Sequence, residues 1–275
     1  MIRMSGFERF LLFLPILGDL FFGLAPLLAP VVLARALGYS GDDPYLMRLA
    51  GAATLGYAAA RAVGVWRGNW LEARFLVIAT LVYSLCALFA CAVAYASGAA
   101  QPIVAVIVLN SLMELAVCAW LLVRFRAVRG GQPTIPASGV AVVVIAIVAA
   151  FVTGLPALLL PQPVGHLLGY KVTDVIVLSL AGAATCGYAV MGLFELRSRN
   201  WTEMRLPIFM AMVFNGAGLL ATVVNFVEGG PILLPLVVLV ATLIVTPAAA
   251  IALRRFGFGS SAEAAQQVRV ASASS

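Results

Sequence analysis

Charged residues are scarce in this sequence of 275 residues. Only 10% of them are Asp, Glu, Lys or Arg, while 63% are hydrophobic, and the mean hydropathy is +1.08. A water-soluble domain of this composition has too little polar surface to cover its core, whereas apolar runs of about 20 residues can span a bilayer. The shortage of charge therefore excludes a soluble fold and predicts an integral membrane protein.

Residues suited to metal or disulfide chemistry are also few. The four cysteines lie within apolar runs without a CxxC pair, which indicates small buried side chains: Cys86, Cys91, Cys118 and Cys186. The single histidine, His166, has no Cys, His or acidic residue at metal-ligand spacing. We therefore expect no metal site and no cofactor.

Common enzyme motifs and nucleic-acid-binding patterns are absent from the chain. It has no GxSxG, Walker loop, HExxH, glycine fingerprint for phosphate or CxxCH. Its formal net charge of +6 comes from Arg residues between hydrophobic runs, without a basic patch interleaved with aromatic residues. We expect no nucleic-acid partner, and nothing specifies an enzyme, although intramembrane catalysis stays open.

Eight apolar runs are long enough to cross a membrane. They lie near 10–33, 46–66, 75–98, 102–123, 140–160, 174–195, 206–227 and 231–252. The first run is longer than the apolar part of a signal peptide and contains Asp19, so we interpret it as a retained helix. This order predicts four segments: a membrane repeat at 1–128, a cytoplasmic linker at 129–139, a second repeat at 140–256 and a disordered tail at 257–275.

One stretch occurs twice and relates the two halves of the chain. LAGAATLGY at 49–57 returns as LAGAATCGY at 180–188, an offset of 131 residues. The same offset aligns further positions: Gly23 with Gly154, Pro30 with Pro161, and 69–74 with 200–205. Matches at one constant spacing indicate internal duplication. The small residues predict a seam where helices pack closely and let each bundle close.

The basic residues predict the orientation in the membrane. Most of the 17 Lys and Arg residues lie between runs on one side, while Arg35, Arg48 and Lys171 lie on the other. The positive-inside rule then places both termini in the cytoplasm. Because each half has an even number of spans, the halves are expected to be parallel. We predict an all-α integral protein of eight transmembrane helices in two parallel four-helix bundles, in a bacterial inner membrane.

Two polar loops of the form NWxExR are the first candidate sites. Their residues are Asn69, Trp70, Glu72 and Arg74 in one copy, and Asn200, Trp201, Glu203 and Arg205 in the other. Asn caps the following helix, Glu suits its first turn, Trp suits the membrane interface, and Arg pairs with Glu or lipid phosphate. A structural role and a binding site for headgroups or a partner on the cytoplasmic face both stay open.

Three charges inside spanning runs form the second candidate site: Asp19, Arg61 and Glu114. A charge in a membrane is costly, so it is normally paired or functional. At about 1.5 Å per residue, both carboxyls lie about 14 Å from the cytoplasmic ends of their helices, within reach of Arg61. Asn110 shares a helix face with Glu114. The aligned positions of the second half lack all three charges: Ala150, Gly192 and Val245.

These four residues have two interpretations. One is an intramembrane polar pocket in the first bundle, which binds a ligand headgroup or relays a proton. The other is structural: Arg61 extends to the cytoplasmic interface, and Asp19 and Glu114 are hydrogen-bonded inside the protein. The residues alone leave both open.

The second run also carries a family resemblance. Residues 48–51 and 55–57 resemble the R-x-x-G-x-x-x-L-G pattern of DoxX-like four-helix membrane proteins, and the unit would occur twice in this chain. The second copy has Leu178 or Ser179 near the place of Arg48. The resemblance implies compact bundles that serve as accessories in membrane redox or lipid-associated processes, and it implies no catalytic residue.

Three functions are compatible with these observations. The leading hypothesis is a non-enzymatic protein that binds a lipophile or acts as an accessory subunit, with membrane lipids, a lipophilic small molecule or a membrane protein as partner. The second is a small-solute or proton-coupled transporter that uses Asp19, Arg61 and Glu114, and the third is an intramembrane enzyme. A transporter needs a polar path to both faces, whereas the turn near Gly98 and Pro102 is uncharged. This favours the first hypothesis.

Overall fold

The computed structural model describes residues 2–39, 43–96, 102–128, 130, 134–135, 140–170 and 176–256. The predicted tail and most of the predicted linker lie outside these residues. The described chain is helical, with eight long helices: α1 (Gly6–Leu28), α3 (Pro44–Arg67), α4 (Trp70–Ala96), α5 (Pro102–Arg124), α6 (Ala141–Leu159), α8 (Ile176–Ser198), α9 (Trp201–Glu228) and α10 (Leu233–Phe256). Two short helices, α2 (Pro30–Ala36) and α7 (Pro161–Leu167), join α1 to α3 and α6 to α8.

Seven of the described helices are long and apolar enough to cross a membrane: α1, α4, α5, α6, α8, α9 and α10. The prediction of an all-helical chain is confirmed, and the seven helices are those of an integral membrane protein. Helix α3 has 24 residues but is less apolar, because it carries Arg48, Arg61 and Arg67. It packs between α1 and α9, where Arg48 and Arg61 are buried.

Local sequence sets the helix ends. Ser5 and Glu8 form a reciprocal capping box at the start of α1. Asp43 caps α3, which ends at Gly68 in a left-handed conformation with a φ of 60° that suits glycine. Asn200 caps α9 by accepting the backbone N–H of Thr202 at 3.0 Å. These signals place the NWxExR loops at the turns between long helices.

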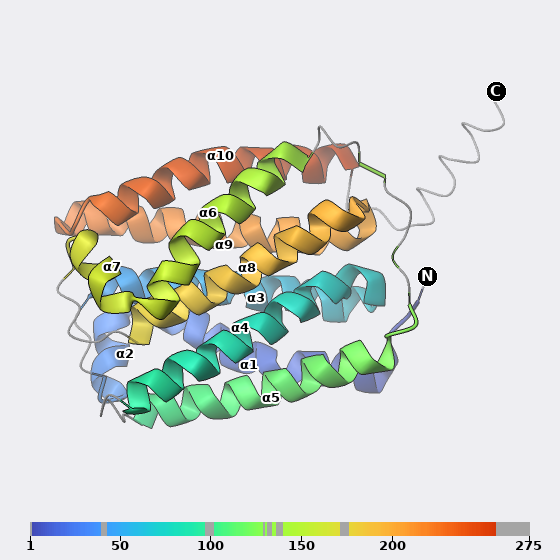
Figure 1. Cartoon of the computed structure of the whole chain (residues 1–275), viewed down its shortest axis with the longest axis horizontal. Helices are drawn as coiled ribbons and strands as arrows, with labels where there is room; N and C mark the ends of the chain where they lie inside the picture. The colour runs from blue at the N-terminus through green and yellow to red at the C-terminus, as the bar shows by residue number, and fades with distance from the viewer. Residues whose placement is uncertain are drawn as a thin grey trace.

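The long helices lie side by side in one bundle (Figure 1). Helices α2 and α7 lie at one end, and α1 begins at the other, which we call the basic end because the NWxExR loops lie there. Helix α3 packs on α1 and α9, α4 on α5 and α8, α6 on α8, and α10 on α9. Within one half, α3 makes few contacts with α4, and α8 few with α9. Contacts between the halves therefore close the bundle.

Each copy of the repeated stretch has a glycine that brings two helices of its own half together. A Cβ atom on Gly51 would lie 2.7 Å from the carbonyl oxygen of Gly23 in α1. A Cβ atom on Gly182 would lie 2.6 Å from the carbonyl oxygen of Gly154 in α6. These distances leave no room for a side chain, so the helix backbones are in direct contact. This contact is the packing seam that the small residues predicted.

The end of the same stretch joins the two halves. Tyr57 Oη donates a hydrogen bond to the carbonyl oxygen of Ala184 at 3.2 Å, and Tyr188 Oη donates one to that of Ala53 at 3.4 Å. The offset of 131 residues that relates Tyr57 to Tyr188 also relates Ala53 to Ala184, so the two bonds are reciprocal. Gly56 leaves room for the Tyr188 hydroxyl. The stretch therefore holds the halves to each other as well as packing each one.

Candidate functional site

The two NWxExR loops exchange ion pairs at the basic end. Arg74 Nη1 lies 3.1 Å from Glu203 Oε1, and Arg205 Nη2 contacts Glu72 Oε1. Each arginine thus pairs with the glutamate of the other copy. Glu72 and Glu203 are buried, with 2% and 0% of their surface exposed. The buried ion pairs link the halves in the same reciprocal way as the tyrosines.

Side chains in and just before the loops donate further hydrogen bonds to the two carboxylates. Glu72 accepts hydrogen bonds from Arg67 Nε at 2.5 Å and from Asn69 Nδ2 at 2.8 Å, and Glu203 accepts one from Ser198 Oγ. This favours the structural interpretation of the loops over a headgroup site, because the charges already have protein partners.

The loop tryptophans lie inside the protein. Trp70 is 1% exposed and stacks on Phe125, with ring centroids 4.5 Å apart. Trp201 is 9% exposed and packs against Phe256 at 5.1 Å. Aromatic rings near the helix ends therefore cover both tryptophans, and their place in the interfacial belt stays a prediction.

The three intramembrane charges meet in the first half of the chain. Arg61 Nη1 contacts Asp19 Oδ2 and lies 3.1 Å from Glu114 Oε1. All three side chains are buried, at 1% to 2% exposure. The interpretation that Arg61 extends to the interface is wrong, because its guanidinium points inward to both carboxyls. We call Asp19, Arg61 and Glu114 the charge cluster.

Two hydroxyl groups of α4 complete the charge cluster. Thr80 Oγ1 accepts a hydrogen bond from Arg61 Nη2 at 3.2 Å, and Ser84 Oγ donates one to Glu114 Oε2 at 2.9 Å. Sequence reasoning missed both residues. Their spacing of four residues puts them on one helix face, and this pattern could have linked them to the charges. Helices α1, α3, α4 and α5 therefore all contribute to this polar centre.

The second half has no charged side chain at the equivalent positions, which are Ala150, Gly192 and Val245. Gly192 stands where the first half has Arg61, and a Cβ atom there would clash with the Ile147 side chain of α6. Asn215, which aligns with Ser84, has uncharged partners: its Nδ2 donates to the carbonyl oxygen of Ala211 at 2.8 Å, and its Oδ1 accepts from Thr242 Oγ1 at 3.4 Å. The charges are thus a property of the first half alone.

A second arginine of α3 joins the halves at the opposite end of the bundle. Arg48 Nη1 and Nη2 donate to the two carboxylate oxygens of Glu228 at 2.6 and 2.8 Å. This two-pronged geometry is the one that guanidinium favours. The arginine of the DoxX-like pattern therefore has a structural partner in α9.

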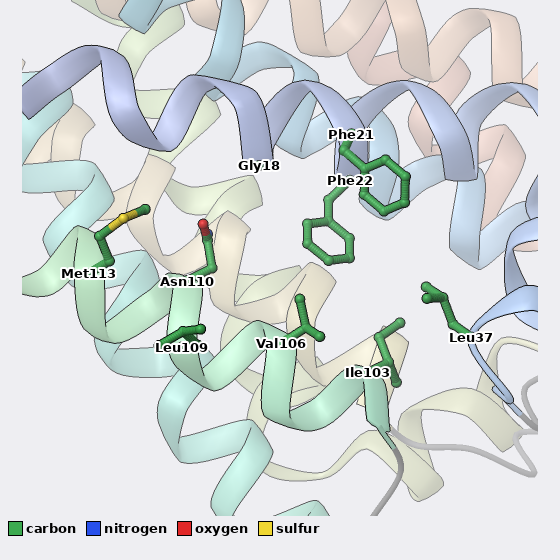
Figure 2. Close-up of a pocket in the computed structure, with 9 residues that line it drawn as sticks. All are labelled: Gly18, Phe21, Phe22, Leu37, Ile103, Val106, Leu109, Asn110 and Met113. Carbon is green, nitrogen blue, oxygen red and sulfur yellow. The ribbon is translucent and has the colours of Figure 1, made fainter. Parts of the chain in front are cut away.

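An apolar groove of about 380 Å³ lies between α1 and α5, and the residues that line it are drawn in Figure 2. It is lined by Gly18, Phe21 and Phe22 of α1, Leu37 after α2, and Ile103, Val106, Leu109, Asn110 and Met113 of α5. Helices α1 and α5 make few contacts, which leaves the space between them. Phe21 and Leu109 are 50% and 71% exposed, so the groove opens on the outer apolar surface of the bundle.

Asn110 connects this groove to the charge cluster. Its side chain is half-buried at the groove wall, and its Nδ2 lies 3.4 Å from Glu114 Oε1. The Oδ1 atom lies beside Gly18, where a Cβ atom would be only 2.8 Å away. Of the four residues of the predicted polar pocket, Asn110 lines this groove, and Asp19, Arg61 and Glu114 do not. The predicted pocket is in fact an apolar groove with a buried ion cluster behind one amide.

No protein-family model, curated protein or solved structure matches the chain. Among the residues that the structure describes, no group of three or more His, Cys, Asp or Glu could hold a metal ion. The DoxX-like resemblance stays a prediction, and the function has to be argued from the geometry.

Proposed function

We propose that the protein is a non-enzymatic integral membrane protein that holds one lipophile in the groove between α1 and α5. The chain crosses the membrane eight times as two parallel repeats, with the basic end in the cytoplasm of a bacterial cell. Helix α3 is the eighth span. Its 24 residues cover about 36 Å, and its three charged side chains, Arg48, Arg61 and Arg67, all have acidic partners.

The half-buried amide of Asn110 carries this proposal. Every other residue that lines the groove is apolar or glycine. A polar group that faces hydrocarbon without a partner is costly, and water is excluded there. An amphiphile in the groove supplies the missing hydrogen bond while its apolar part packs on Phe21 and Phe22. A volume of about 380 Å³ falls within the range of small-molecule sites.

The packing between the halves favours this function over transport. Tyr57 is fully buried there and stacks on Tyr83, with ring centroids 5.2 Å apart. Tyr188 packs against Phe214 at 5.3 Å. Aromatic side chains thus occupy the centre, where two repeats that alternate in access would hold a substrate. The groove, by contrast, opens sideways between two helices.

The test is to identify what the purified protein retains. We expect native mass spectrometry of the full chain, followed by lipid extraction, to find one bound lipophile. Gly18→Leu fills the groove and should abolish retention. Ala149→Leu is the matched control, because Ala149 aligns with Gly18 at the repeat offset and faces outward from α6.

Folding has to be checked separately from binding. Circular dichroism of each variant shows whether the helices are intact. Val106→Trp is a second variant that fills the groove, at a position that is 47% exposed and so tolerates a larger side chain. Equal retention by the wild type and by both folded groove variants would show that the groove is not the binding site.

A further inference from the structure

Asn110 has a defined orientation because of the group behind it. Glu114 accepts hydrogen bonds from Arg61, Ser84 and Asn110, so both carboxylate oxygens act as acceptors. Because Glu114 Oε1 is an acceptor, the Asn110 side chain must turn its Nδ2 group toward it. If the amide were flipped, Asn110 Oδ1 would face Glu114 Oε1, and two oxygen acceptors would be in contact. Glu114 is therefore a positioning residue for the amide, and Ser84 and Arg61 hold Glu114 in place.

The opposite side of the amide, its acceptor oxygen, then points from α5 toward α1 across the groove (Figure 2). Asn110 Oδ1 lies against the bare backbone of Gly18 at the groove wall. No donor among the described residues contacts this oxygen. A ligand pairs with it only by donating a hydrogen bond. A ligand that carries acceptors alone leaves the oxygen without a partner.

The surroundings of the amide favour a neutral ligand. Asn110 follows the first residue of α5 by eight positions, which places it about 12 Å along the helix, deep in the hydrocarbon. Charged ends are costly at that depth. An anionic end would also face the Asn110 oxygen with the acidic pair of the charge cluster behind it. The groove runs along α5 from Ile103 to Met113, about 15 Å, which suits a single chain.

We infer that the groove selects an uncharged single-chain lipophile that ends in a hydroxyl group, which donates to Asn110 Oδ1. This inference rests on the proposed function, because it names the class of molecule that the same groove takes. The role of the charge cluster follows from it: Glu114 holds the acceptor side of Asn110 toward the ligand.

Three probes with the same chain length test the inference. They are 1-tetradecanol, its methyl ether, which lacks the donor, and tetradecyl sulfate, which carries a permanent negative charge. Binding of each probe to the full chain in nanodiscs is measured by native mass spectrometry. We expect wild type to bind the alcohol about tenfold more tightly than either of the other two, as one hydrogen bond allows.

Two variants report on the residues behind this preference. Asn110→Leu should bind the alcohol and the ether equally. Glu114→Gln should also reduce the preference, because a Gln side chain can donate as well as accept and no longer fixes the amide. This variant leaves Arg61 paired with Asp19, so one buried guanidinium faces one buried carboxyl group. If both folded variants keep the full preference for the alcohol, the inference is overturned.

The same series separates this inference from the proposed function. If no probe binds wild type, or all bind Gly18→Leu as tightly, the groove is not a ligand site and the proposed function fails. If the probes bind wild type and are lost in Gly18→Leu, but the ether or sulfate binds as tightly as the alcohol, the groove stands and the hydroxyl selectivity is wrong.

Discussion

Removal of Arg61 tests the charge cluster most severely. Arg61→Met keeps a long side chain in α3 but leaves Asp19 and Glu114 buried without a counter-charge. The lost attraction between unit charges 3.1 Å apart is about 5 kcal/mol at an effective dielectric of 20. Protonation of the carboxyls recovers part of this, so we expect unfolding free energy to fall by about 3 to 5 kcal/mol.

A triple variant gives the same prediction a matched control. Asp19→Asn and Glu114→Gln combined with Arg61→Met remove all three charges together, as in the second half. Since a neutral set has no unbalanced charge, the triple variant should be more stable than Arg61→Met alone by about 2 kcal/mol or more. Glu114→Gln alone should cost about 1 kcal/mol, because the remaining Arg61 and Asp19 form a neutral pair.

The assay is reversible unfolding in mixed micelles, followed by circular dichroism. The losses of unfolding free energy add when sites are independent. Without coupling, the triple variant would therefore lose as much unfolding free energy as its three single variants together. The reasoning about the cluster is refuted if Arg61→Met unfolds within about 0.5 kcal/mol of wild type. It is also refuted if the triple variant is less stable than Arg61→Met.

Three further predictions concern the contacts between the halves and the orientation. Glu203→Arg places like charges together and should cost about 3 kcal/mol in the same unfolding assay, and adding Arg74→Glu should restore at least half of it; no restoration would mean that the pair does not matter. Tyr57→Phe and Tyr188→Phe should each cost about 1 kcal/mol, with near-equal values because their hydrogen bonds are reciprocal; a large difference would contradict this. In a cysteine-free chain, Leu167→Cys should react with an impermeant maleimide in intact cells and Arg126→Cys only after lysis, whereas the reverse pattern would invert the proposed topology.

The meeting of the charge cluster could be predicted because helix geometry is regular. Asp19 and Glu114 lie at similar depths by residue count alone, and a buried charge needs a partner. The seam could be predicted from its small residues for the same kind of reason. Close backbone contact is what Gly51 and Gly182 permit in any membrane helix.

The groove could not be predicted, because the inward and outward faces of these helices are equally apolar. Phe21 lines the groove and Leu12 is buried, yet nothing in the sequence distinguishes their surroundings. Lipid provides no amphipathic pattern of the kind that marks the core of a soluble protein. The few contacts between α1 and α5 are a property of the packed bundle and leave no mark in the sequence.

The pairing of each loop arginine with the glutamate of the other loop also could not be predicted from the sequence. Arg74 and Glu72 lie in the same loop, so a pair within one copy was as plausible as the observed pair with Glu203. Only the arrangement of the halves decides between them, because it brings α4 and α9 together at the basic end. Reciprocal contacts at Tyr57 and Tyr188 follow from the same arrangement.

A crystal structure of the full chain from a lipidic mesophase tests the central claim most directly. Our account predicts elongated density along the groove between α1 and α5, with its polar end about 2.8 Å from Asn110 Oδ1. A groove closed by Phe21 and Phe22, or one that holds only a bilayer acyl chain without a polar contact to Asn110, would contradict the account.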